Sequence, residues 1–294
     1  MAWRFALVID PVASDDQRED FSDTLHTVDP NAPVLPLGEL SAQRGDGVFE
    51  SLGVVDGHPQ EVGPHLERLA RSAGLCDLPT PNPAQWRAAI ERVAAEAGAG
   101  ESVIKLILSR GVESGASPTA WITLATAPDN VRARRDGVRI ATLDRGYPAD
   151  VPARAPWLLL GAKTLSYAVN MAAIREAQRR GADDAVFVTN DGVVLEAPTA
   201  SVLLRVGDRF VTPEPQAGIL HGTTQLSLFS HLESRGFSTS YETVLLDDLE
   251  DADAAWLLSS VRLAAPVSAV DGRPKTVDRE LTADLNAYLL SPRD

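Results

Sequence analysis

Arg44-Gly45-Asp46-Gly47-Val48-Phe49-Glu50 is the most informative stretch of this 294-residue sequence. It leads into a β-rich segment at residues 48–55, which contains a glycine and ends at the dipeptide Asp56-Gly57. β-Branched and aromatic residues that end at Asp-Gly predict a strand followed by a hairpin turn. On their own, two glycines beside an acid and an aromatic residue are typical of a tight turn, so the surrounding motifs decide what the stretch means.

Short β-rich runs alternate with helical patterns on both sides of this stretch, which predicts a mixed α/β chain. Pro128-Asp129-Asn130 and the charged residues after them are typical of a linker. We therefore expect one domain at residues 1–127, a linker at 128–136 and a second domain at 137–294. The expected strands are 3–9, 48–55, 103–108, 120–125, 138–143, 185–189, 193–196, 201–206, 209–211, 239–245 and 254–259. The expected helices are 64–75, 83–97, 165–180, 224–235 and 277–290.

The composition excludes several classes of partner. The chain has 27 Lys+Arg against 41 Asp+Glu, and a net charge of −14 disfavours binding to nucleic acid or to an anionic membrane. The single cysteine, Cys76, leaves no cysteine cluster for zinc or iron–sulfur chemistry, so no metal site is expected. No targeting signal or membrane-spanning run is recognisable. With 44% hydrophobic residues, we expect a soluble, cytoplasmic protein with a sizeable core.

Lysine is rare in this chain: of 27 basic residues, only Lys105, Lys163 and Lys275 carry a primary amine. Lys163 lies in a largely apolar segment, 158–165, where burial would lower the pKa of its ammonium group, as a Schiff-base lysine requires. The alternative is a lysine whose stem lies on apolar surface while its head reaches water. Lys105, in a strand pattern, and Lys275, after a turn, are expected to be structural or exposed.

Three further motifs carry polar groups that suit an anion. Arg68 follows His65 by three residues in a predicted helix, where a solvent-facing arginine is the alternative. Gly222-Thr223-Thr224 begins a predicted helix, where backbone N–H groups and hydroxyls can hold a phosphate, although threonine is also a common N-cap. Ser259-Ser260, with Arg262, follows a buried-looking strand. Each motif alone is weak evidence.

Together and in this order, the motifs resemble the fold-type IV pyridoxal-phosphate enzymes, which include branched-chain aminotransferases, D-amino-acid aminotransferases and 4-amino-4-deoxychorismate lyases. The resemblance covers residues 44–267 and includes Lys163, Glu196 and Pro266-Val267. It implies a two-domain α/β (α+β) fold with a small N-terminal α/β domain and a larger C-terminal domain with a barrel-like β core. It also implies pyridoxal 5'-phosphate as cofactor, a homodimer, and a small-molecule substrate that is an amino-dicarboxylate or an amino acid.

The resemblance also implies a role for each motif residue. Lys163 would be the catalytic lysine that binds the cofactor as a Schiff base and moves protons. Glu196 would pair with the pyridine nitrogen, and Tyr167, aligned with a one-residue gap, would lie near the ring hydroxyl. Ser166 stands where the family usually shows asparagine. The residues expected on the cofactor phosphate are Arg68, Thr223, Thr224, Ser259 and Ser260.

The choice among family members rests on the expected substrate-binding residues Arg44, Phe49, Arg110 and Arg262. Aminodeoxychorismate carries two carboxylates, and a branched-chain aminotransferase usually has tyrosine or phenylalanine where Arg44 stands. The sequence therefore favours 4-amino-4-deoxychorismate lyase, with a D-amino-acid or branched-chain aminotransferase as the alternative. A non-catalytic binding protein that retained the fold is a third possibility. The roles of His65 and His221 stay open between packing or capping and function.

Overall fold

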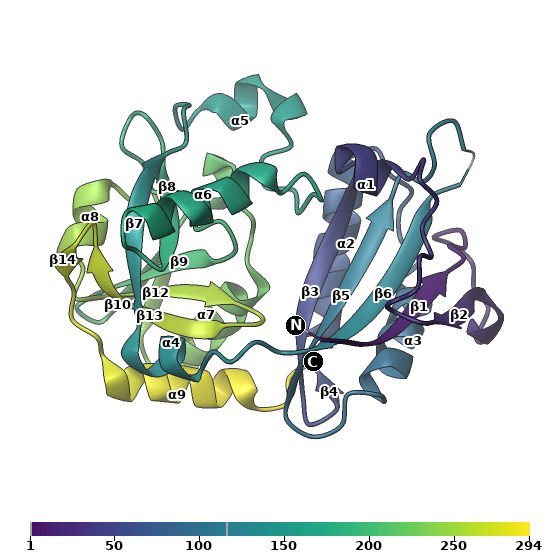
Figure 1. Cartoon of the computed structure of the whole chain (residues 1–294). Coiled ribbons are helices and arrows are strands. Elements are labelled where there is room, and N and C mark those ends of the chain that lie inside the picture. Colours follow the sequence, from purple (N-terminus) through teal and green to yellow (C-terminus); the bar gives the residue numbers. More distant parts are fainter. Residues whose placement is uncertain (1, 116) are drawn as a thin grey trace. The chain divides into compact units, whose positions relative to one another are not determined.

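The computed structural model describes residues 2–115 and 117–294, which divide into two compact units (Figure 1). Unit 1 comprises Met1–Pro128, Ala162–Tyr167 and Pro292–Asp294, and unit 2 comprises Asp129–Gly161 and Ala168–Ser291. Residues 128–136, expected to be a linker, instead include helix α4 (Val131–Asp136), because Ala133 packs on the core of unit 2. Residues 162–167, expected in the second domain, belong to unit 1.

Unit 1 is built on one antiparallel six-stranded sheet with the strand order β2-β1-β6-β5-β3-β4. Helices α2 and α3 pack against this sheet and against each other (Figure 1). The strands are β1 (Trp3–Ile9), β2 (Leu25–Val28), β3 (Gly47–Val55), β4 (His58–Pro59), β5 (Glu101–Ser109) and β6 (Thr119–Thr126). The helices are η1 (Ser22–Thr24), α1 (Leu40–Arg44), α2 (Val62–Leu75) and α3 (Pro83–Ala94).

The two longer helices of unit 1, α2 and α3, follow from their sequences. Leu66, Leu69 and Ala73 recur at helical spacing in α2, and all three are buried. Helix α3 begins where Asn82 accepts hydrogen bonds from the N–H groups of Ala84 and Gln85, with proline at the first helical position. These caps and apolar faces position α2 and α3 on the sheet.

Unit 2 contains a mixed eight-stranded sheet with the order β11-β10-β9-β12-β13-β7-β8, and β14 pairs with β13. Val194 bridges to Val188 in β8, and its N–H donates to the carbonyl of Val244, which follows β11. These contacts connect the two ends of the sheet and give it a barrel-like closure. The strands are β7 (Val138–Asp144), β8 (Asp184–Val188), β9 (Ser201–Val206), β10 (Arg209–Pro213), β11 (Ser238–Glu242), β12 (Ala254–Ser259), β13 (Leu263–Val270) and β14 (Arg273–Pro274).

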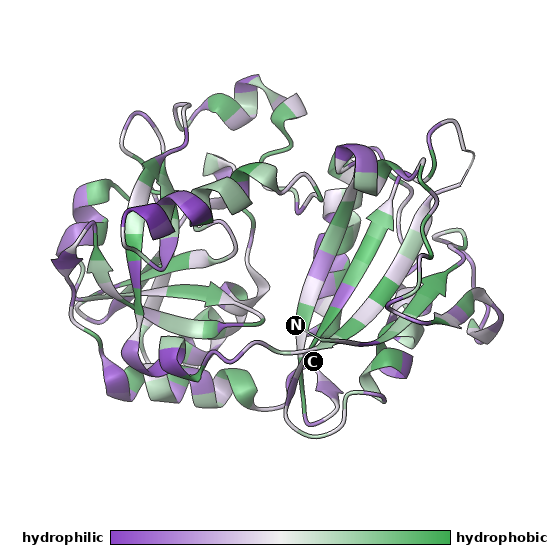
Figure 2. Cartoon of the chain, viewed as in Figure 1, coloured by the Kyte–Doolittle hydropathy of each residue, from purple (hydrophilic) through white to green (hydrophobic). Residues whose placement is uncertain are grey.

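Helices cover the sheet of unit 2, and its interior is apolar. Phe210 and Trp256 pack with leucines of α7 and α9, and strand β12 is predominantly hydrophobic (Figure 2). In the described part of the chain, no helix is long and apolar enough to span a bilayer. The helices are α4, α5 (Val151–Arg154), η2 (Pro156–Leu158), α6 (Ala168–Arg179), η3 (Pro215–Ala217), α7 (Thr223–Ser234), α8 (Leu246–Asp251) and α9 (Arg279–Leu290).

Residues 163–165 pair with the beginning of β3. On the same edge, β4 pairs with Val54 and Val55 at the end of β3. The N–H of Phe49 donates to the carbonyl of Lys163 at 2.9 Å, and the N–H of Leu165 donates to the carbonyl of Gly47 at 2.8 Å. This pairing explains why α6 begins at Ala168, three residues later than the sequence predicts. The expected strand 193–196 is likewise reduced to isolated bridges.

Gly47 is required where this segment meets β3. A Cβ atom at Gly47 would lie 2.7 Å from the carbonyl oxygen of Leu108 and 2.8 Å from Cδ1 of Leu165. Gly45, at φ +66°, ends α1 in the left-handed conformation, where a Cβ would lie 3.0 Å from Ser166. The Gly-Asp-Gly motif therefore allows two close backbone approaches.

We predict that Gly47→Ala destabilises the protein by about 1–3 kcal/mol, because the added methyl group meets backbone that cannot move independently. Urea unfolding followed by circular dichroism measures the change. Gly74→Ala is the matched control: it adds the same methyl group in α2, where nothing lies within 4 Å, and should stabilise by up to about 1 kcal/mol. Equal effects of the two substitutions would contradict the assignment.

Candidate functional site

Lys163 is half-buried in unit 1 and lies over an aromatic ring. Its Nζ is 4.6 Å from the ring centroid of Phe49 and 6.0 Å from that of Tyr167. The two rings meet edge to face with centroids 5.3 Å apart. The backbone N–H of Lys163 donates to Ser72 Oγ of α2 at 3.1 Å. Strand pairing and this hydrogen bond thus fix the backbone that carries the amine.

Lys105 of β5 lies on the same ring. Its Nζ is 4.6 Å from the centroid of Phe49, and burial lowers the pKa of its ammonium group. The sequence predicts a structural or exposed lysine, but the structure places a half-buried one beside the Lys163 side chain. Strand alternation alone could not find it, because the relation depends on the register between β3 and β5.

Arg68 forms a buried ion pair on the opposite face of β3. Its Nε and Nη2 donate to the two carboxylate oxygens of Glu50 at 2.7 and 2.8 Å, and His65 Nδ1 lies 2.7 Å from the same carboxylate. The sequence predicts Arg68 as a phosphate ligand. In the structure its guanidinium group is buried and is held by the buried carboxylate of Glu50. His65, whose role the sequence left open, belongs to the same cluster.

The Glu50 cluster balances two opposing effects on one carboxyl group. Complete burial raises the pKa of Glu50, while the charge of Arg68 and the hydrogen bonds from Arg68 and His65 lower it. The lowering dominates and holds the pKa well below its usual range. Glu50 is therefore ionised throughout the neutral and mildly acidic range.

The structure pairs each expected substrate arginine with a carboxylate of its own unit. Arg44 is exposed and pairs with Glu113 at 3.3 Å. Arg110 donates from Nε to Asp46 at 2.7 Å, and from Nη1 and Nη2 to the carbonyls of Asp77 and Cys76. Arg110 thereby ties the end of β5 to the end of α2.

Arg262 anchors the turn after β12 in unit 2. Its Nη1 donates to Asp184 of β8 at 2.8 Å, and its backbone N–H donates to Ser259 Oγ at 3.2 Å. Arg134 of α4 donates from Nε to the carbonyl of Arg262 at 2.9 Å. Arg262 thus positions the serine turn through buried Asp184, a residue that sequence reasoning missed because the two are 78 positions apart.

Three hydroxyl groups meet at the N-terminus of α7. The Oγ1 atoms of Thr223 and Thr224 each lie 3.3 Å from Ser260 Oγ, and both threonines are buried. Gly222 precedes them as the N-cap, and a Cβ there would collide with Ser201. A helix N-terminus lined with hydroxyls favours an anion such as phosphate. Ser259, in contrast, is used within its own turn.

Glu196 lies beside aromatic and basic groups of unit 2. Its Oε2 accepts a hydrogen bond from the N–H of Leu220 at 3.2 Å. Burial raises the pKa of Tyr147, and the charge of Glu196 adds to this effect. Arg145, whose guanidinium lies 4.6 Å from the ring centroid of Phe187, opposes it. Tyr147 and Arg145 had no signal in the sequence analysis.

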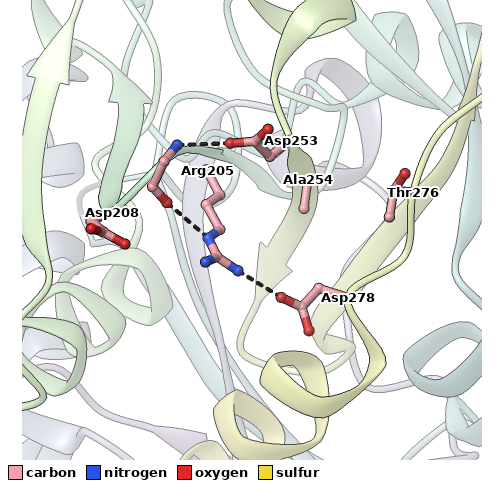
Figure 3. A pocket seen from close by; sticks show the side chains of 7 residues that line it. Arg205, Asp208, Asp253, Ala254, Thr276 and Asp278 are labelled. Atoms are coloured by element: carbon pink, nitrogen blue, oxygen red, sulfur yellow. Dashed lines mark hydrogen bonds and ion pairs between the residues drawn. The ribbon is translucent and has the colours of Figure 1, made fainter.

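A pocket in unit 2 lies at the end of β9 and the start of β12 (Figure 3). It contains the Arg205–Asp278 ion pair, at 2.8 Å, where β9 ends and β12 begins. Ser201 and Ser259 mark the opposite ends of those strands. None of the expected site residues lines this pocket. Within residues 2–115 and 117–294, no group of three or more acidic, histidine or cysteine residues could hold a metal ion.

The Lys163 amine lies over Phe49 in unit 1, and the hydroxyl cluster of Thr223, Thr224 and Ser260 lies in unit 2. The family model for amino-transferase class IV matches residues 47–270. The chain belongs to the class IV aminotransferase family.

Individual relatives agree with this assignment. The chain is 46% identical over 279 residues to the bifunctional aminodeoxychorismate lyase / D-amino acid transaminase of Mycobacterium tuberculosis, covering 90% of this chain and 96% of that protein. The fold IV-transaminase CpuTA1 of Curtobacterium pusillum superposes with a TM-score of 0.93 at 46% identity, covering 97% of each chain. A hypothetical aminotransferase of M. tuberculosis in its PLP-bound form gives 0.90 at 42% identity, covering 99% of this chain and 100% of that one.

We predict that Glu50→Gln destabilises the protein by about 3–5 kcal/mol, because the buried Arg68 charge loses its counter-charge. Chemical unfolding at pH 7 measures the loss. Glu113→Gln removes the exposed partner of Arg44 and should change stability by less than about 1 kcal/mol.

The Glu50 contribution also depends on pH. Because its pKa is lower in the folded than in the unfolded state, its stabilisation is complete above the unfolded carboxyl pKa, about 4.5, and falls as the pH drops below that value. Glu50→Gln should flatten this part of the stability profile. A variant profile parallel to that of the wild type below pH 4.5 would show that Glu50 is not the group responsible.

Proposed function

We propose that this protein is a pyridoxal-phosphate-dependent lyase that converts 4-amino-4-deoxychorismate into 4-aminobenzoate and pyruvate, a step in folate biosynthesis. The carrying observation is the placement of Lys163, whose amine lies over Phe49 on a backbone fixed by β3. The similarity to a protein named for this lyase activity supports the choice of substrate.

The residues present fit the cofactor's two main chemical demands. Thr223, Thr224 and Ser260 supply hydroxyls at a helix N-terminus for a phosphate group. Glu196, whose Oε2 already accepts one backbone hydrogen bond, supplies a carboxylate for the ring nitrogen. Arg68 stays a proposed phosphate ligand. Its two hydrogen bonds to Glu50 fix the orientation of its guanidinium group.

When bound, pyridoxal phosphate withdraws electrons from the substrate carbon that carries the amine, which makes the hydrogen on that carbon acidic. Lys163 Nζ receives this proton and returns one as the pyruvate fragment leaves. The Phe49 ring covers one side of the amine and limits its contact with water. Formation of the aromatic product drives the elimination, so the protein mainly orients the substrate and moves protons.

The pairing of the arginines changes the proposal for substrate carboxylates. Arg110 and Arg262 hold protein groups, and we assign them to positioning rather than to direct substrate binding. Arg44 keeps an exposed guanidinium in a surface pair and is the remaining candidate of the three. Phe49 contacts both lysines and stays a proposed substrate-site residue.

D-Amino-acid transamination is the second candidate activity, because the relative at 46% identity is named for both reactions. Both reactions begin by removing a proton from the carbon that bears the amine, so Lys163 could serve either. A branched-chain aminotransferase is disfavoured by arginine at position 44. We further propose a cytoplasmic homodimer, on the family resemblance and the acidic, single-cysteine composition.

We predict that the purified, cofactor-loaded protein releases pyruvate from 4-amino-4-deoxychorismate and, in the second activity, transfers the amine of D-alanine to 2-oxoglutarate. A coupled pyruvate assay and an amino-acid assay on one preparation measure the two. Absence of pyruvate release at full cofactor load would overturn the lyase proposal. Lys163→Ala should abolish both activities, and retention of either would overturn the role of Lys163.

We predict that Thr224→Val weakens pyridoxal phosphate binding by about 10- to 100-fold, because the phosphate loses one hydroxyl donor. Equilibrium dialysis measures the affinity. Ser230→Ala removes an exposed hydroxyl from the same helix and should leave the affinity unchanged. Equal affinities of wild type and Thr224→Val would remove Thr224 from the phosphate site.

A further inference from the structure

Two lysine side chains share one aromatic ring in unit 1. Lys105 Nζ and Lys163 Nζ each lie 4.6 Å from the ring centroid of Phe49. The two ammonium groups are therefore no farther apart than twice that distance. The chain has only three lysines, so two of them meet at this ring.

Sheet geometry brings the two amines together. In the β3–β5 register, Lys105 pairs with Ser51 and Ile107 pairs with Phe49. Residues 49 and 51 point to the same face of β3, so Lys105 lies diagonally across from Phe49 on that face. Lys163 reaches the same ring because its carbonyl accepts the N–H of Phe49.

The Lys105 ammonium contributes a positive charge beside the Phe49 ring. Of the described residues, none accepts a hydrogen bond or forms an ion pair with the Lys105 ammonium. Glu50 points to the other face of β3 and is held by Arg68 and His65. Asp46, just before β3, pairs with Arg110. Tyr167 is a further titratable group of unit 1 near Lys163, with its ring centroid 6.0 Å from Lys163 Nζ.

We propose that Lys105 is a second lysine of the candidate active site, whose positive charge keeps a larger share of the Lys163 amine in its neutral, nucleophilic form. Lys105 acts through Lys163, so it is a positioning residue. The Phe49 ring stabilises the charged form of both lysines. The positive charge of Lys105 destabilises the charged form of Lys163 and so opposes the effect of the ring. A neutral amine is what attack on a carbonyl and acceptance of a proton both require.

The separation sets the expected size of the effect. Two unit charges about 9 Å apart shift each other's pKa by about 0.3 units at the dielectric constant of water and by about 1.3 units at an effective value of 20. Burial lowers the pKa of Lys105 as well, so the two amines titrate as a coupled pair. The catalytic role of a neutral Lys163 amine rests on the proposed function. The electrostatic coupling between Lys105 and Lys163 does not depend on that function.

The test is nuclear magnetic resonance of the cofactor-free full chain after reductive methylation with ¹³C. Three lysine signals are expected besides that of the α-amino group, and Lys105→Met and Lys275→Met assign them. In Lys105→Met the pKa of Lys163 should rise by at least about 0.3 units, whereas Lys105→Arg should restore the lower value. Lys275→Met is the matched control, since Lys275 is also half-buried but donates to carbonyls of unit 2, and it should leave Lys163 unchanged.

The proposal is overturned if the pKa of Lys163 is the same in the wild type and in folded Lys105→Met. This holds also if the variant raises KM, because an unchanged pKa would mean that Lys105 binds a substrate carboxylate instead. If Lys105→Met does not fold, the wild type gives the answer by salt titration. Screening between 0.01 and 1 M salt should raise the pKa of Lys163 more than that of Lys275, and equal responses overturn the proposal. Activity retained by Lys163→Ala would refute the proposed function while leaving this measurement intact.

Discussion

Two backbone hydrogen bonds carry the candidate site of unit 1: the N–H of Phe49 to the carbonyl of Lys163, and the N–H of Leu165 to the carbonyl of Gly47. They turn a segment whose flanking residues belong to unit 2 into an added strand on β3. Because adjacent strands bring their side chains into register, the pairing places the Lys163 amine on the Phe49 ring. The small residue at position 47 is the condition for this approach.

Each unit contains a buried carboxylate that is held by an arginine. Glu50 binds Arg68 and His65 in unit 1, and Asp184 binds Arg262 in unit 2. The first pair connects α2 to β3, and the second connects the turn after β12 to β8. Buried pairs of this kind contribute little net stability but strongly penalise loss of one member. They are therefore best understood as fixing geometry around the site.

Much of the fold follows from local patterns in the sequence. Strands β1, β9 and β12 have the predicted bounds because each contains a run of three β-branched, aromatic or leucine residues. Strand β13 was missed because Ala264, Ala265 and Pro266 are poor strand formers, and only the neighbouring strands β12 and β7 fix their conformation. Motif order singled out Lys163 and the hydroxyls of Thr223, Thr224 and Ser260, and the structure brings these three hydroxyls together. The partners of Arg110 and Arg262, and the place of Lys105, depend on contacts between residues distant in sequence, which no local pattern contains.

The discontinuity of unit 1 bears on how the chain emerges from the ribosome. The strands of its sheet all lie between residues 3 and 126, and among the described residues it is 163–165 that pair with the open part of the β3 edge. During synthesis, the first unit therefore waits for about 35 further residues with an unpaired edge, at which another nascent chain can pair. The segment that brings the Lys163 amine to the Phe49 ring also covers this edge, so one pairing event both protects the sheet of unit 1 and positions the amine.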